Sequence, residues 1–168
     1  IKWAQRILFC LTFPEFFKQR TPYAKMRLLD LVIKRLSLTR FSMLQAINTI
    51  HNRLMVTLQG LSHQLNSNIS RTRKITELVA HHNAFVDHFH RSAFLDDKSK
   101  RTRGIIIEML KLAKVVKDEW NNVETFAMLD AAGKIDDSIS LINLNVNSME
   151  IEKAFKACEN QLSDLLDL

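Results

Sequence analysis

The sequence predicts an all-α fold, a helical bundle of about five to seven helices, some of them long. Only 3 Gly and 2 Pro occur in 168 residues, whereas all-β and α/β folds need many turns and therefore many of both. Apolar residues recur at spacings of three and four over long stretches, which is typical of amphipathic helices. The hydrophobic content of 46% argues against disorder. The length predicts one domain, residues 1–168.

The first predicted helix covers residues 1–13 and ends at Pro14. Its apolar face consists of Trp3, Ile7, Leu8 and Leu11. Residues 14–22 are expected to connect it to the next helix. Thr21 is a candidate N-cap there, because Pro22 at the first helical position loses no hydrogen bond.

Residues 23–59 contain neither Gly nor Pro, so we expect one very long helix or two helices that meet near Leu38. Its apolar stripe consists of Leu28, Val32, Leu36, Phe41, Leu44, Ile47 and Leu54. Leucines then follow in steps of 4, 3 and 4, as in a coiled-coil seam, at Leu54, Leu58, Leu61 and Leu65. Gly60 is not expected to break this pattern.

Polar residues 66–70 predict a turn, and Ser70 is the expected N-cap of a helix over residues 71–94. The apolar face of that helix consists of Ile75, Leu78, Val79, Phe85, Val86 and Phe89. Its first turn would contain Arg71, Arg73 and Lys74. Positive charge at a helix start opposes the helix dipole, and this mild cost points to a partner or to screening by solvent.

Residues 104–120 are apolar over a wide face, which indicates a buried helix. Residues 121–147 are the least regular part, with a short helix expected at 123–132 before Gly133. Asn147 with Glu150 resembles a capping box that opens the last helix, at 148–166. The predicted core residues of the bundle are Trp3, Leu44, Ile47, Leu54, Phe85, Phe89, Leu112, Trp120 and Phe155.

The net charge of +6 hides a gradient along the chain. Residues 1–40 hold 9 Lys+Arg against 2 Asp+Glu, residues 41–104 hold 9 against 4, and residues 105–168 hold 6 against 12. A uniformly basic coat would favour nucleic acid as partner. A chain that is basic at one end and acidic at the other favours docking to a protein partner. Solvated helix faces of different sign are the alternative interpretation.

The sequence contains no pattern typical of an enzyme, a cofactor site or a metal site. Residues 81–90 hold four His and Asp87, but no two of these His are three or four residues apart, as ligands on one helix would be. We therefore expect no metal and no cofactor. Two Cys without a pairing pattern favour a reducing compartment. No apolar run is long enough for a membrane helix.

Several segments, in this order, resemble the C-terminal domain of the gamma-tubulin complex component family. These segments are residues 1–4 (IKWA), 43–55 (MLQAINTIHNRLM), 75–87 (ITELVAHHNAFVD), 92–95 (SAFL), 110–120 (LKLAKVVKDEW) and 155–158 (FKAC). His82 matches the family's histidine in the third segment, and Phe85 matches the aromatic residue after it. The first, second and last segments are most similar to the component-5 branch. Residues 121–147 match nothing in the family.

The resemblance implies a non-catalytic scaffold subunit of the gamma-tubulin ring complex. Such a subunit binds gamma-tubulin and holds it as a template for microtubule nucleation. Its implied partners are gamma-tubulin and sibling complex components, and its implied location is the cytoplasmic cytoskeleton, at the centrosome and spindle pole. Because the chain begins at Ile1 and not at Met, we expect it to be the C-terminal, gamma-tubulin-binding part of a longer protein.

The contacts with gamma-tubulin are predicted from basic position alone. The candidates are Arg40, Arg53, Arg71, Arg73, Lys74, Lys98, Lys100 and Arg101. One alternative is a helical scaffold that contacts sibling subunits or adaptors without touching gamma-tubulin. The other is a basic nucleic-acid-binding module. With one Tyr, and with Phe residues mostly on core-like stripes, no aromatic platform for bases is visible, so no nucleic acid is expected.

Overall fold

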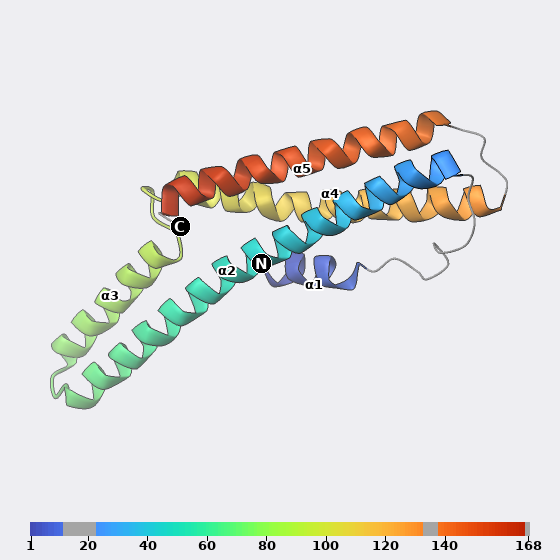
Figure 1. The fold of residues 1–168 in the computed structure, drawn as a ribbon. Coiled ribbons are helices and arrows are strands. Elements are labelled where there is room, and N and C mark those ends of the chain that lie inside the picture. Colours follow the sequence, from blue (N-terminus) through green and yellow to red (C-terminus); the bar gives the residue numbers. More distant parts are fainter. Residues whose placement is uncertain (12–22, 133–137, 167–168) are drawn as a thin grey trace.

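The computed structural model describes residues 1–11, 23–132 and 138–166, and the regular elements in these residues are five α-helices. They are α1 (Lys2–Cys10), α2 (Tyr23–Arg71), α3 (Ile75–Ser92), α4 (Lys100–Ala131) and α5 (Ser138–Leu166). The helix α1, the first half of α2, α4 and α5 form a four-helix body (Figure 1). The second half of α2 and α3 project from it as a two-helix arm. The all-α prediction is confirmed.

The long helix α2 links the body to the arm. It has 49 residues and continues through Leu38 and Gly60. Of the two alternatives, one very long helix is therefore confirmed, and two helices that meet near Leu38 are excluded. The prediction of a turn at residues 66–70 is wrong, because these residues belong to α2. There the hydroxyl of Ser70 donates to the carbonyl of Asn66 (2.8 Å). Bonds of this kind, to the carbonyl four residues earlier, let polar residues continue a helix.

The core of the body lies where α2, α4 and α5 meet. Ile47, Trp120 and Phe155 are buried there, as predicted. The wide apolar face expected over residues 104–120 is buried in α4, because neighbouring helices cover it on several sides. Other predicted core residues are half-buried, namely Leu44, Leu54 and Leu112.

The prediction that two aromatic residues lie on buried apolar faces is wrong. Trp3 and Phe41 are each 58% exposed. The buried face of α1 is Ala4 and Leu8, one residue round the helix from Trp3. The helix α1 ends at Cys10. Leu11 follows in an extended conformation. Residues 12–13 of the expected first helix, the connection over residues 14–22 and its Thr21 cap lie outside the described residues.

The stretch expected to be irregular is largely helical. The helix α4 continues to Ala131, which absorbs the short helix predicted at 123–132, and α5 begins at Ser138. Asn147 therefore lies inside α5 and is not an N-cap. Its amide donates instead to the carboxylate of Glu119 in α4 (3.2 Å). Sequence pattern could not reveal this tertiary bond. The expected break at Gly133 lies outside the described residues.

Candidate functional site

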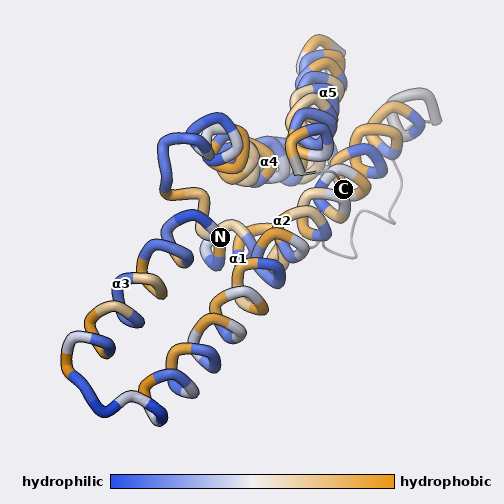
Figure 2. Tube along the Cα trace, turned by 90° about the vertical axis from the view of Figure 1, so that its left-hand side faces the viewer, coloured by the Kyte–Doolittle hydropathy of each residue, from blue (hydrophilic) through white to orange (hydrophobic). Residues whose placement is uncertain are grey.

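The arm, defined here as residues 53–92, is the candidate functional site. Figure 2 shows α3 and the second half of α2 running next to each other away from the body. No side chain of α3 is buried, and Leu61 is the one buried hydrophobic residue between Arg53 and Ser92. In the arm each helix thus has a single helical neighbour, and most of its surface faces solvent.

The inner face of the arm carries the predicted leucine seam. Leu61 is buried and Leu58 and Leu65 are half-buried, and they face the half-buried side of α3, which contains Phe85 and Phe89. The two phenylalanine rings stack at a centroid distance of 6.4 Å. The other four residues of the expected face of α3 are exposed, because α2 covers only one side of this helix. They are Ile75, Leu78, Val79 and Val86.

The tip of the arm carries a basic cluster of Arg71, Arg73 and Lys74, all exposed. Arg71 is the last residue of α2, and Lys74 is the N-cap of α3. The expected unfavourable charge at a helix start is therefore wrong for Arg71. A cation at the C-terminal end of a helix is favoured by the helix dipole. Lys74 pairs loosely with Glu77 (3.8 Å).

The base of the arm carries a second basic cluster of Lys98, Lys100 and Arg101, also exposed. It follows α3 and includes the start of α4. The helix α3 has 18 residues, so at about 1.5 Å per residue the two clusters lie about 27 Å apart. The structure thus divides the predicted basic residues between two separate surfaces.

A tight corner fixes the angle between the arm and the body. The N–H of Leu95 donates to the carbonyl of His90 (2.9 Å), and the N–H of Phe94 donates to that of Arg91 (3.1 Å), which is a Schellman motif. Phe94 has a φ of 58°, a conformation that disfavours side chains larger than Gly. Its ring packs against the core of the body, and Arg103 donates to its carbonyl (3.0 Å).

Asp96 follows the corner and lies beside Ser99, the N-cap residue of α4, whose side chain makes no capping hydrogen bond to the helix. Hydrogen bonding from Ser99 holds the pKa of the Asp96 carboxyl below its ordinary value. An Asp carboxyl is ionised at neutral pH without any shift, and the Asp96 carboxylate offsets part of the positive charge of the base cluster.

Arg40 and Arg53 differ from the six clustered residues. Arg53 is exposed on α2 where the arm begins. Arg40 lies in the body, where it donates to the carbonyls of Leu8 and Phe9 in α1. Its guanidinium also lies 5.8 Å from the ring centroid of Trp120 in α4. Arg40 thus joins three helices, and this structural role accounts for its position.

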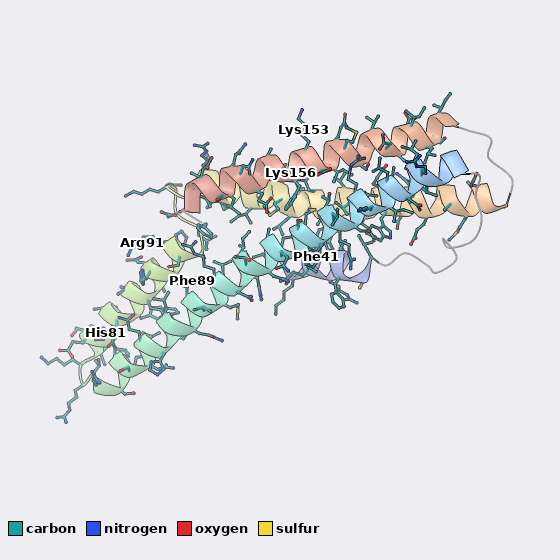
Figure 3. The ribbon with its side chains drawn as sticks, viewed as in Figure 1. Phe41, His81, Phe89, Arg91, Lys153 and Lys156 are labelled. Carbon is teal, nitrogen blue, oxygen red and sulfur yellow. The ribbon has the colours of Figure 1, made fainter. Side chains whose placement is uncertain are left out.

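All six histidines of the chain lie between His51 and His90, on or beside the arm. His81 and His88 line a groove of about 370 Å³ between α2 and α3, together with Asp87 and Arg91. Figure 3 labels His81 and Arg91 on α3. Across the described residues, no three His, Cys, Asp or Glu side chains are grouped so that they could hold a metal ion. None of the described helices is long and apolar enough to cross a membrane.

The geometry of the arm suits binding to a surface. It presents exposed cations at both ends and half-exposed aromatic and apolar side chains between them. The sequence predicted the cations and the leucine seam but not the projection, because periodicity shows which face is apolar and not how many neighbours cover it. The expected face of α3 includes the adjacent pairs Leu78–Val79 and Phe85–Val86. Adjacent residues do not point to the same side of a helix, and this was the signal in the sequence.

The chain matches no family model, no curated protein and no solved structure. The resemblance seen in the sequence segments therefore supports a proposal about function and does not establish membership of a family.

Proposed function

We propose that this chain is a non-catalytic scaffold that binds gamma-tubulin through its arm and holds it as a template for microtubule nucleation. The observation that carries the proposal is the position of the predicted contact residues. Seven of the eight are exposed, and they lie on the arm or at its two ends.

The resemblance to gamma-tubulin complex components falls largely on the same region. Residues 43–55 lead along α2 into the arm, residues 75–87 lie in α3, and residues 92–95 form the corner at its base. His82, which matches the family's histidine, is exposed on α3. Phe85, which matches the aromatic residue, contributes to the contact with α2.

The proposed mechanism is positional. Tubulins are acidic, so basic clusters on an arm would steer one towards the site and orient it. A body with a well-filled core would hold neighbouring gamma-tubulins in a preset arrangement. Presetting the arrangement removes much of the entropy cost of forming a nucleus.

The test is a charge reversal at the tip. We expect Arg71→Glu, Arg73→Glu and Lys74→Glu together to weaken co-purification with gamma-tubulin at least about tenfold, because loss of attraction is joined by repulsion. The matched control reverses three exposed lysines of α4, at Lys111, Lys114 and Lys117. It changes the net charge equally and should leave co-purification intact.

Unchanged co-purification in the tip variant, with normal helicity by circular dichroism, would remove the tip from the interface. The same reversal at Lys98, Lys100 and Arg101 then tests the base cluster separately. Absence of any binding to purified gamma-tubulin by the unaltered chain would instead favour a scaffold that contacts only sibling subunits.

Nucleic acid is tested by binding to a random-sequence duplex over a range of salt concentrations. A steep log–log decrease of affinity with salt would support the nucleic-acid-binding alternative. No binding at low salt would exclude it.

A further inference from the structure

Glu119 of α4 is a buried carboxylate with no cation beside it in the described part of the chain. The residue is only 6% exposed, and its hydrogen-bond donors are the side-chain amides of Asn122 (3.1 Å) and of Asn147 in α5 (3.2 Å). None of the ion pairs among the described residues includes it. Buried carboxylates in proteins are normally paired with a cation or bind a metal ion, so the charge of Glu119 lacks a counterpart within these residues.

The two amides leave the Glu119 carboxylate able to accept a further hydrogen bond. A carboxylate has about four acceptor positions on its two oxygens. Asn122 donates to Oε2, and the amide of Asn147 is shared between Oε1 and Oε2 at 3.2 and 3.4 Å. Both oxygens accept, as in the ionised form. Because the amides are neutral, they satisfy hydrogen bonds and leave the negative charge in place, and a positively charged donor would balance it.

Glu119 lines a hollow of about 290 Å³ between α4 and α5, the two helices that run next to each other along the body in Figure 1. This volume is at the lower limit for ligand pockets, so it suits a single side chain and not a large cofactor. The exposed carboxylate of Glu150 also lines it. The rest of the wall is mostly apolar, with Leu112, Val115, Ile151 and Ala154. A matching ligand therefore combines a hydrocarbon stem with a positively charged end.

The charged residues one helical turn from this lining do not change its sign. They are Glu108, Lys111 and Asp118 on α4 and Lys153 on α5. Lys111 is held by Glu108 at 2.7 Å, and Asp118 adds an exposed negative charge. Lys153 forms no ion pair with a described residue, and it lines a separate hollow that Arg35 also lines. The carboxylates thus outnumber the cations around the hollow, which favours a cationic ligand.

We propose that the hollow between α4 and α5 binds an arginine side chain of another protein. Its alkyl stem packs on Leu112, Val115 and Ile151, and its guanidinium donates to the carboxylate of Glu119. Arginine fits better than lysine, because the planar guanidinium matches a carboxylate and is more weakly hydrated than an ammonium group. The hollow lies in the acidic part of the chain, residues 105–168. This inference is independent of the proposed binding of gamma-tubulin by the arm.

The test compares two peptides in NMR titrations of the whole, isotope-labelled chain. One is acetyl-Leu-Arg-Leu-amide. In the other, citrulline replaces Arg, which keeps the shape of the side chain and removes its charge. The Arg peptide should shift the amide signals of residues 112–119 and 147–154. It should bind at least about tenfold more tightly than the citrulline peptide, because only the guanidinium forms a charge-assisted pair with the carboxylate.

The variant Glu119→Gln removes the buried charge and keeps the size of the side chain, so it should bind the two peptides equally. The matched control, Glu159→Gln, removes an exposed carboxylate of α5 that does not line this hollow. It should retain the tenfold preference for the Arg peptide. Circular dichroism checks that both variants fold, and the comparison of the two peptides on the unaltered chain depends on neither variant.

Several results would overturn the proposal. One is the absence of saturable shifts, or equal binding of both peptides by the unaltered chain. Another is a preference for Arg that Glu119→Gln retains, because the charge recognised would then lie elsewhere. Spermidine or Ca²⁺ that binds the same residues more tightly than the Arg peptide would assign the hollow to a free polyamine or a metal ion. A concentration-dependent dimer in sedimentation velocity that Glu119→Gln abolishes would assign it to a second copy.

Discussion

The body and the arm use the same helix, α2, in different ways. In the body, α1, α4 and α5 surround α2, and residues such as Leu36 and Met43 are fully buried. In the arm α3 is its one helical neighbour, and Leu61 alone is buried. Because helix stability in proteins comes mainly from packing of the apolar face, the body should be stable and the arm locally labile. The exposed arm keeps its surface available for a partner.

The largest effect is expected from opening the core of the body. Trp120 of α4 is 2% exposed, belongs to the core of the body and lies against Arg40 of α2. Trp120→Ala should lower the free energy of unfolding by about 3–5 kcal/mol, because it leaves a large cavity. Chemical denaturation followed by circular dichroism measures this loss. A change below about 1 kcal/mol would show that the body is not the stable part.

A smaller effect is expected where Arg40 joins α1 to α2 and α4. Arg40→Ala removes hydrogen bonds to two carbonyls of α1 and the contact with the Trp120 ring. The expected loss is about 2 kcal/mol of the free energy of unfolding. The affinity for gamma-tubulin should not change when the variant and the unaltered chain are compared at equal concentrations of folded protein. Weakened binding with unchanged stability would make Arg40 a contact residue.

The smallest and most local effect is expected inside the arm. Phe85 is half-buried and stacks on Phe89, a pair worth about 1 kcal/mol. Phe85→Ala should therefore speed hydrogen exchange in α3 about fivefold. Amides of α4 and α5 should exchange as before. Faster exchange throughout the chain would show that arm and body unfold together.

The sequence predicted the buried faces of α4 and α5 well and the number of neighbouring helices poorly. The apolar faces of α4 and α5 contain Trp120 and Phe155 and are buried as expected, since each meets more than one helix. The expected face of α3 is as apolar as these, but α2 covers only one side of it. Periodicity carries no information about the number of helices that pack against a face.

Polar residues misled the prediction of helix ends for a related reason. Ser70 and Asn147 both have good capping side chains. In the structure Ser70 bonds to the carbonyl of Asn66 within its own helix, and Asn147 bonds to Glu119 of another helix. The hydrogen-bond partner of a polar side chain depends on tertiary structure, which local spacing does not reveal.

Hydrogen exchange of the chain with and without purified gamma-tubulin tests the central claim most directly. The account predicts protection of amides in the arm, over residues 53–92 and at the corner that follows, with α4 beyond its first turn and α5 unchanged. Protection confined to α4 and α5, with none in the arm, would contradict it.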